Sequence, residues 1–240
     1  MLLSNRMQAV VGLVAPCASI ADIGCDHGYV AIELISRCIC QHVFAMDIHL
    51  GPLERAKHNI KEYRMQEYIE TRQSNGMESL SKGEAEGVIC AGMGGRLIIS
   101  ILERGQMLVR DMRQVVLQPQ SEIDEVRAYL RKNGFLIEKE DIICEDGKYY
   151  PMMRALPNVP GRQEKQTAEN LTRIRDMYGS YLLEKSHPTL KRYLLWQKEH
   201  TQQILENLIC QCQPTLRQQQ RIDELNQKLR DIVYCLYHYF

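Results

Sequence analysis

Short apolar runs alternate with amphipathic stretches along the first 156 residues of the chain. The runs predict strands, and the stretches with apolar residues three and four positions apart predict helices. The predicted strands are 18–24, 42–48, 68–73, 87–92 and 114–119, and the predicted helices are 3–14, 28–36, 51–65, 96–105 and 122–134. Because strands that alternate with helices build βαβ units, the pattern predicts an α/β fold with a parallel sheet.

Two further predicted strands, 135–145 and 149–156, are separated only by Asp146, Gly147 and Lys148. A parallel connection needs a crossover of a dozen or more residues, so this short link predicts an antiparallel hairpin at the sheet edge.

The strand pattern ends at a stretch rich in proline and glycine, 157–163. The helical patterns beyond it run to about Lys185, start near Pro188 and start near Pro214. The last one has a seam of apolar residues spaced three and four apart: Ile222, Leu225, Leu229, Ile232 and Leu236. The seam favours a coiled-coil-like antiparallel hairpin over an ordinary amphipathic bundle. We therefore predict two domains, 1–156 and a helical domain over 157–240.

The composition, 45% hydrophobic and 25% charged, is typical of a globular protein. The chain has neither a run long enough to cross a bilayer nor a signal-peptide layout, so we expect no membrane association and a cytoplasmic location. The nine cysteines are odd in number and mostly lie in apolar segments, which favours reduced thiols. The pairs Cys38/Cys40 and Cys210/Cys212 lack a second pair at zinc spacing, so we expect no metal.

The charge is unevenly divided along a chain whose net charge is zero. Residues 1–160 hold 18 basic against 21 acidic side chains, and residues 161–240 hold 12 against 9. A nucleic-acid partner would therefore need a local basic patch. Candidate cations near the predicted pocket are Arg6, Arg96, Arg104, Arg110 and Arg113, and those in the helical tail are Lys185, Lys191, Arg192 and Lys198.

The first predicted strand leads into a glycine turn that is acidic. Gly24 and Gly28 bracket it, and Asp22 and Asp26 lie in or beside it. A dinucleotide turn binds an anionic pyrophosphate and has the spacing G-x-G-x-x-G, which this turn lacks. S-adenosylmethionine carries an ammonium and a sulfonium group, which carboxylates attract. The turn therefore favours S-adenosylmethionine over NAD as the cofactor.

Residues after the next two strands extend the predicted cofactor site. Asp47 ends the second strand, where an acid can bind both ribose hydroxyls, and Ile48 beside it can pack on the adenine face. After the third strand, Asn75 and Gly76 can bond the adenine edge, and Met77 can lie against the ring. A simple turn is the alternative explanation for these three residues.

The fourth strand ends in the glycine-rich segment Ala91–Gly95. Glycines are costly at a strand end unless a ligand must approach the backbone closely. Ligands of open α/β sheets bind at the carboxyl ends of the strands. Methyl donor and acceptor are therefore expected to meet above Gly24–Tyr29 and Ala91–Gly95.

Five stretches together resemble one known family: ADIGCDHGYV, GPLERAKHNI, AGMGG, LQPQ and EDGKYY. The resemblance is to the bacterial TrmK family, S-adenosylmethionine-dependent methyltransferases that modify N1 of adenine 22 in tRNA. It covers residues 1–156 and continues more loosely into LEKSHPTLKRYL, 183–194. It implies a Rossmann-like class I methyltransferase sheet, S-adenosylmethionine as cofactor, tRNA as partner and no obligatory protein partner.

The resemblance also implies roles for individual residues. The methionine end of the cofactor is assigned to Asp22, Gly24, Asp26, His27 and Gly28. The ribose is assigned to Asp47, and the adenine edge to Asn75. The other expected cofactor contacts, Ile48, Gly76, Met77 and Ala91, follow from their positions at or after the strand ends. The target base is assigned to Tyr29, by stacking, and to the backbone of Gly92, Met93 and Gly94. Asn75 and Gln120 depart from the family pattern, which favours aspartate and asparagine there.

Three alternatives stay open from the sequence: a methyltransferase of another RNA, a protein or a small molecule; a nicotinamide-dependent oxidoreductase; and a non-enzymatic adaptor. Tyr29 can also pack in the core, and His27 can pack under the turn as a purely structural ring.

Overall fold

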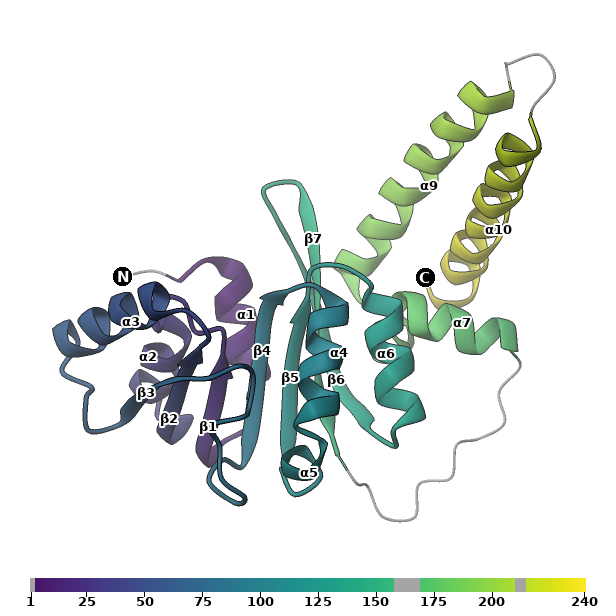
Figure 1. The fold of residues 1–240 in the computed structure, drawn as a ribbon. Coiled ribbons are helices and arrows are strands. Elements are labelled where there is room, and N and C mark those ends of the chain that lie inside the picture. The colour runs from purple at the N-terminus through teal and green to yellow at the C-terminus, as the bar shows by residue number, and fades with distance from the viewer. Residues whose placement is uncertain (1–2, 158–168, 210–214) are drawn as a thin grey trace. The chain divides into compact units, whose positions relative to one another are not determined.

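The computed structural model describes residues 3–157, 169–209 and 215–240, which belong to two compact units, Met1–Gln166 and Thr167–Phe240 (Figure 1). The strands of the first unit are β1 (Cys17–Ile23), β2 (Cys40–Asp47), β3 (Ile69–Gln73), β4 (Gly87–Met93), β5 (Gln114–Pro119), β6 (Leu136–Glu145) and β7 (Lys148–Leu156). Its helices are α1 (Asn5–Leu13), α2 (Tyr29–Ser36), α3 (Leu50–Glu62), α4 (Gly95–Arg104), α5 (Gln106–Val109) and α6 (Ile123–Lys132).

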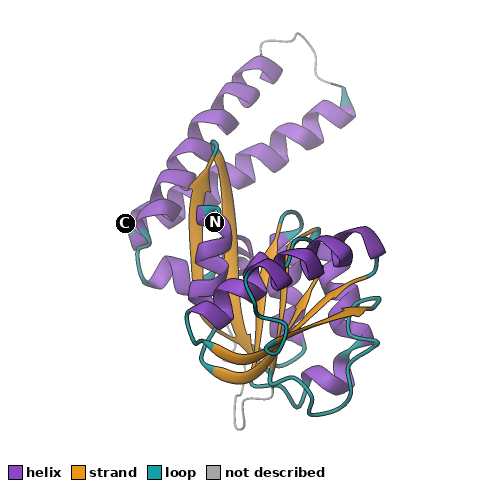
Figure 2. Ribbon diagram, turned by 90° about the vertical axis from the view of Figure 1, so that its left-hand side faces the viewer, coloured by secondary structure: helices purple, strands orange, loops and turns teal. Residues whose placement is uncertain are grey.

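The strands of the described residues form one seven-stranded sheet in the order β3-β2-β1-β4-β5-β7-β6. The pairs among β1 to β5 are parallel, and β7 is antiparallel to both β5 and β6. The predicted parallel sheet with an antiparallel final hairpin is therefore confirmed. Figure 2 shows the strands fanned by twist between the helices. The strand order changes direction between β1 and β4, and such a switch point is where open α/β sheets bind ligands.

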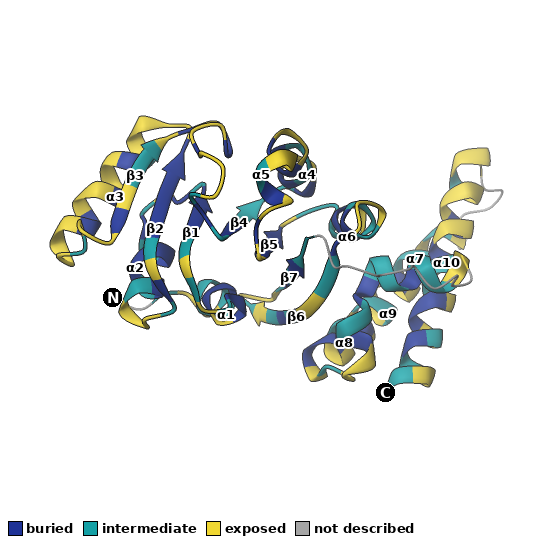
Figure 3. Cartoon of the chain, turned by 90° about the horizontal axis from the view of Figure 1, so that it is seen from below, coloured by how far each residue is buried: buried dark blue, intermediate teal, exposed yellow. Residues whose placement is uncertain are grey.

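Helices cover both faces of the sheet (Figure 3). One buried cluster joins the sheet to α1, α2 and α3 through residues such as Val10, Leu34 and Ala56. The other joins it to α4, α5 and α6 through residues such as Ile98 and Leu130. Because both faces are buried, the central strands are near-continuous apolar runs, as parallel strands require.

The helices of the second unit are α7 (Glu169–Tyr178), α8 (Ser180–Glu184), α9 (Pro188–Ile209) and α10 (Leu216–Tyr239). Gly179, with a φ of +84°, separates α7 from α8. Thr215 and Gln218 form a capping box that starts α10. In Figures 1 and 2, α9 and α10 lie side by side. Of the predicted seam, Ile222, Leu225 and Ile232 are buried, and Leu229 and Leu236 are half-buried.

Several sequence expectations fall on residues that the structure leaves undescribed. All of the predicted Pro/Gly-rich break after Pro157 belongs to these undescribed residues, so the domain boundary at 156/157 stays a prediction. The Cys210/Cys212 pair and Pro214 also lie outside the described residues. Among the residues that the structure does describe, no helix is long and apolar enough to cross a membrane, and no cluster of metal-ligating side chains occurs.

Candidate functional site

The predicted cofactor residues lie along one edge of the sheet, at the carboxyl ends of β1, β2, β3 and β4. The turn Gly24–Gly28 follows β1, Asp47 ends β2, Asn75 follows β3, and Gly92 lies at the end of β4. Parallel pairing of these strands brings the four segments to the same edge. This edge is the candidate functional site.

The two glycines of the turn after β1 are favoured both by their backbone conformation and by close packing. Gly24 and Gly28 have φ values of +73° and +71°, a region that favours glycine. A Cβ on Gly24 would lie 2.3 Å from Cε of Met93, and a Cβ on Gly28 would lie 3.2 Å from Cβ of Ala56. The turn therefore touches both the segment that ends β4 and helix α3, and it brings Gly24 and Met93 together as predicted site neighbours.

Asp22 is the next-to-last residue of β1, and its carboxylate is buried, with 3% of the residue's surface exposed. Its Oδ2 has no hydrogen-bond partner among the described residues. Burial, followed by the charge of Asp47, raises the pKa of Asp22 to about 7. Asp47 accepts a hydrogen bond from the backbone N–H of His49 through Oδ1, at 2.9 Å. Two neighbouring buried acids, one of them lacking a partner, suit a cationic ligand.

Asp26 already has a cationic partner. Its Oδ1 accepts a hydrogen bond from Nη2 of Arg55 on α3 at 2.9 Å, and its Oδ2 lies 3.4 Å from Nε2 of His27. Since its side chain is also largely exposed, Asp26 is a weaker candidate than Asp22 for the ligand's charge. The prediction that Asp26 meets the cofactor stays a prediction.

Helix α3 supports the turn through residues that were not predicted as site residues. Nδ2 of Asn59 donates a hydrogen bond to the carbonyl of His27 at 2.9 Å, one helical turn beyond Arg55. Both residues lie in the stretch GPLERAKHNI, and their spacing of four places them on one helix face, the signal that could have identified them.

Tyr29 and His27 are stacked, with ring centroids 5.7 Å apart and planes 11° from parallel. Tyr29 is the first residue of α2, is half-buried and packs partly against the core. The structure thus shows partial core packing for Tyr29, and its role toward a target base stays a prediction.

A buried serine links the ends of β2 and β3. The N–H of Ser74 donates to the carbonyl of Asp47 at 2.9 Å, and its hydroxyl donates to the carbonyl of Gly76 at 2.8 Å. The same hydroxyl accepts a hydrogen bond from the N–H of Ser79 at 3.1 Å. Ser74 therefore fixes Gly76 relative to Asp47, although the sequence pattern does not single it out.

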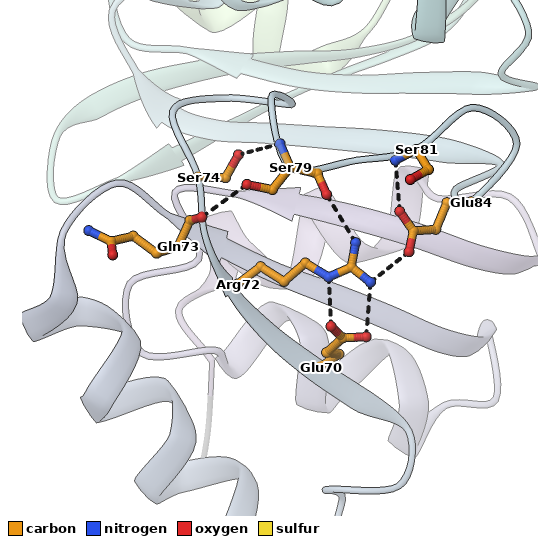
Figure 4. A network of polar contacts seen from close by, with 7 residues as sticks. All are labelled: Glu70, Arg72, Gln73, Ser74, Ser79, Ser81 and Glu84. Carbon is orange, nitrogen blue, oxygen red and sulfur yellow. Dashed lines mark hydrogen bonds and ion pairs between the residues drawn. The ribbon is translucent and has the colours of Figure 1, made fainter.

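Arg72 holds the rest of this loop (Figure 4). Its guanidinium donates to both carboxylate oxygens of Glu70 at 2.6 and 3.0 Å, to Oε1 of Glu84 at 2.6 Å and to the carbonyl of Ser79 at 3.1 Å. It also lies 4.4 Å from the ring centroid of Phe44. The bond to Arg72 is the main cause that lowers the pKa of Glu84 to about 2. The network joins both ends of the segment 74–84 to β3.

The remaining residues near β3 differ in exposure. Ile48 is half-exposed at the edge, and its carbonyl accepts a hydrogen bond from Nε2 of Gln73. Asn75 is exposed and donates to Glu78 at 2.9 Å. Met77 is buried in the core, where its Cε lies 2.2 Å from the position of a Cβ on Gly105. The Met77 side chain belongs to the buried core, and its predicted contact with the adenine ring stays a prediction.

A hollow of about 420 Å³, open to solvent, borders this loop between it and helices α4 and α5. Its lining includes Asn75, Gly76, Met77, Glu78, Ile101 and Arg104. It adjoins the predicted adenine side of the site and does not include Asp22 or Asp47.

The end of β4 contains a β-bulge. The β4–β5 register shifts between Ala91 and Met93, and Gly92 has a φ of +77°. The N–H of Gly92 donates to Oε1 of the buried Gln118 at 3.1 Å. A Cβ on Gly92 would lie 3.8 Å from Nε2 of Gln120, so that side chain faces the bulge. Bulges are common next to active sites, where they re-aim a side chain or end the pairing of two strands.

Close packing against Ser121 explains why glycine stands at positions 94 and 95. A Cβ on Gly95 would lie 2.4 Å from the carbonyl oxygen of Ser121, and one on Gly94 would lie 3.2 Å from its Oγ. Part of the glycine density at the end of β4 therefore serves the contact with the β5–α6 loop.

The arginines predicted to border the pocket are dispersed. Arg96 lies 3.7 Å from Glu125, and Arg104 pairs with Glu78 at 3.0 Å. Arg113 precedes β5 and its N–H donates to the carbonyl of Glu86, which precedes β4. Arg113 thus lies at the amino ends of the strands, and its predicted place at the pocket rim is wrong because the sheet separates the two edges.

The second unit presents a ladder of aromatic rings on α9. The Tyr193 and Trp196 ring centroids lie 6.1 Å apart, and those of Trp196 and His200 lie 5.5 Å apart, with planes within 17° of parallel. Trp196 is 48% exposed. Lys191 and Arg192 are exposed on the same helix, and Lys198 is half-buried.

A Ser74→Ala variant is expected to weaken binding of an adenosine ligand while leaving the fold intact. It loses the hydrogen bond that the hydroxyl donates to the carbonyl of Gly76 and the one that it accepts from the N–H of Ser79, each worth about 0.5–1.5 kcal/mol. We expect the KM for S-adenosylmethionine to rise about three- to tenfold with little change in kcat. Ser81→Ala is the matched control, because Ser81 engages Glu84 through its backbone N–H. Equal KM values for the two variants would contradict the role of Ser74.

Comparisons with known proteins bear on this site. Residues 3–153 match a family described as a methyltransferase domain. A tRNA (adenine(22)-N(1))-methyltransferase of Bacillus subtilis (strain 168) is 30% identical over 227 residues, which cover 95% of this chain and 94% of that protein. A tRNA methyltransferase homologue from Mycoplasma pneumoniae is 31% identical over 70% of this chain and 78% of its own length.

Solved structures are similar along nearly the whole chain. The B. subtilis m1A22 tRNA methyltransferase TrmK superposes with a TM-score of 0.82 at 28% identity, covering 98% of this chain and 99% of its own. A Streptococcus pneumoniae protein solved in complex with S-adenosyl-L-methionine gives a TM-score of 0.83 at 27% identity, covering 98% of this chain and 100% of its own.

Proposed function

Because the chain belongs to the methyltransferase-domain family and to its tRNA (adenine(22)-N(1))-methyltransferases, we propose that it methylates N1 of adenine 22 in tRNA with S-adenosylmethionine. The single observation in the structure that supports this best is the buried, partnerless carboxylate oxygen of Asp22, near the end of β1 and just before the glycine turn. A buried acid of this kind is costly unless a cation completes it. We propose a cytoplasmic location, because the proposed substrate, tRNA, is found there.

The residues at this edge fit S-adenosylmethionine, which supplies an electrophilic methyl group when bound. Asp22 would hold its cationic methionine end, with the backbone of Gly24–Gly28 beside it. Asp47 would hold the ribose hydroxyls, and the loop fixed by Ser74 would hold the adenine through Asn75 and Gly76. We propose Ile48 and Ala91 as flanking contacts, and Asp26 and His27 as groups that shape the turn.

The reaction requires little proton transfer by the protein. N1 of adenine carries a lone pair, so no strong base is needed, and alignment and exclusion of water are the main contributions. N1 lies on the Watson–Crick edge, so the base must be unpaired or extruded to react. We propose that Tyr29 stacks on the base and that backbone groups of Gly92, Met93 and Gly94 bind its exocyclic amine.

The helical unit is proposed as a second contact with tRNA. Stacked aromatic rings next to cations are what single-stranded and looped RNA binds, because every base offers a π-face and every nucleotide a phosphate. Tyr193, Trp196 and His200 provide the rings, and Lys191 and Arg192 provide nearby positive charge.

A tRNA carrying 1-deazaadenine at position 22 is expected to bind but not to react. The replaced nitrogen removes the lone pair, while the ring face and the exocyclic amine remain. Unmodified tRNA, the deaza tRNA and labelled S-adenosylmethionine are compared by label incorporation and nucleoside mapping. Methyl transfer to the deaza substrate would exclude N1 as the acceptor, and label on another nucleoside or on protein would assign a different substrate.

A further inference from the structure

Two cysteines meet at the amino-end edge of the sheet, opposite the candidate site. Cys17 starts β1 and Cys40 starts β2, and the two residues are direct partners in the parallel register. Their Sγ atoms lie 3.3 Å apart. The methyltransferase chemistry uses neither of them.

The register suits a covalent bond between the two sulfurs. Neighbouring strands lie about 4.7–4.9 Å apart, and disulfides span Cα separations of about 4.4–6.8 Å. Direct partners on parallel strands also point their side chains to the same face of the sheet. We propose that Cys17 and Cys40 form a reversible intramolecular disulfide, a modification site for low-molecular-weight disulfide oxidants.

The surroundings divide the roles of the two thiols. Cys17 is half-buried and Cys40 is buried. The hydrogen bond from Cys40 is the main cause that lowers the pKa of the Cys17 thiol, and the same bond and burial raise the pKa of Cys40. Glu86 opposes the ionisation of Cys17 and Arg113 favours it. The more accessible and more acidic Cys17 is therefore the attacking thiolate, and Cys40 resolves the intermediate.

The reaction balances with a small disulfide such as oxidised glutathione. The Cys17 thiolate attacks one sulfur of that disulfide, forms a mixed disulfide and releases one thiolate. Cys40 then loses its proton to solvent, and its sulfur attacks Sγ of Cys17, which breaks the mixed disulfide and releases the second thiol. The protein thiols are oxidised, and the small disulfide is reduced to two thiols.

Other described cysteines are less suited to this pairing. Cys25 and Cys90 are buried, and burial is the main cause that raises the pKa of each. Cys38 and Cys144 are exposed. Cys38 lies in the turn just before β2, so it is the competitor that the experiment must exclude.

The new bond would tie β1 to β2 at their amino ends. Asp22 and Asp47 lie at the opposite ends of the same two strands, so cofactor affinity is expected to stay unchanged. The cross-link restricts the unfolded chain, which raises the thermal midpoint by several degrees. The modification is therefore expected to stabilise the domain under oxidising conditions.

The test treats the full-length protein with oxidised glutathione, blocks remaining thiols by alkylation and maps peptides by mass spectrometry. We expect a Cys17–Cys40 linked peptide in the wild type and in Cys38→Ser, and its loss in Cys40→Ser, which should instead retain a glutathione adduct on Cys17. The midpoint should rise on oxidation and return with dithiothreitol, with S-adenosylhomocysteine affinity unchanged. A persistent Cys17 adduct in the wild type, no reaction at Cys17, or a link through Cys38 would overturn the proposal.

Discussion

An Asp22→Asn variant is expected to lose most of its affinity for S-adenosylmethionine and to become more thermally stable when no ligand is bound. The carboxylate is buried with a partnerless oxygen, so it is positioned for a cation. A charge-assisted hydrogen bond is worth about 1.5–3 kcal/mol, which corresponds to a loss of about 10- to 100-fold in affinity.

The gain in stability follows from the raised pKa of Asp22. The folded protein retains this proton up to a pH of about 7, whereas the ordinary value is 3.8. Between these values the folded state binds more protons than the unfolded state, so stability falls as pH rises through the window. Asparagine has no charge to bury, so the variant's advantage is largest above pH 7. Each 1 kcal/mol recovered raises the midpoint by about 2–4 °C.

The pH dependence of binding provides an independent check on Asp22. The wild-type protein must ionise Asp22 to bind a cation, so its affinity for S-adenosylmethionine should rise between about pH 6 and pH 8. Titration calorimetry in buffers of different ionisation enthalpy should show proton release on binding. The Asp22→Asn variant should show neither effect.

Asp26→Asn is the matched control for Asp22→Asn. Asp26 is exposed and already paired with Arg55, so its loss should weaken binding less and should leave the stability of the free protein nearly unchanged. If Asp26→Asn proved the more damaging variant, the cation site would belong to Asp26 and our assignment of Asp22 would be wrong.

The sheet was predictable because its strands are buried on both faces and separated by turn residues, which sequence periodicity reports directly. The edge that carries the site was predictable too, because parallel strands align Asp22, Asp47 and Gly92 whatever the details of the loops. The short helix α5 was not predicted, because its four residues after Gly105 are too few to show a helical period of apolar residues.

The supporting partners of the site were not predictable, because tertiary contacts choose them. Ser74 resembles an ordinary turn residue in the sequence, and its role follows from hydrogen bonds to Asp47 at the end of β2 and to Gly76 in its own loop. Arg55 neutralises Asp26 only because α3 packs beside the turn. Met77 packs against Gly105, a contact between distant positions that the sequence does not show. A single sequence shows which side chains can form hydrogen bonds or pack together, but not which of them lies beside a given site residue.

Removal of the helical unit is expected to abolish efficient tRNA methylation while preserving cofactor binding. The two buried clusters of the first unit draw all their residues from that unit, so a protein of residues 1–166 should keep its core. Its affinity for S-adenosylhomocysteine should match that of the full chain. Loss of base stacking, worth about 1–3 kcal/mol per base, and of phosphate contacts should lower kcat/KM for tRNA at least about tenfold, mainly through KM.

Point variants separate an RNA contact from a purely structural role of the helical unit. Trp196→Ala should raise the KM for tRNA about five- to 100-fold if the ring stacks on a base, whereas Trp196→Phe should retain much of the affinity because a π-face remains. Lys191→Ala should weaken tRNA binding modestly and reduce its salt dependence. In both cases circular dichroism and S-adenosylhomocysteine affinity should stay at wild-type values. Full tRNA activity in the 1–166 protein would show that the helical unit does not contribute to RNA binding, and the ladder on α9 would then need another partner.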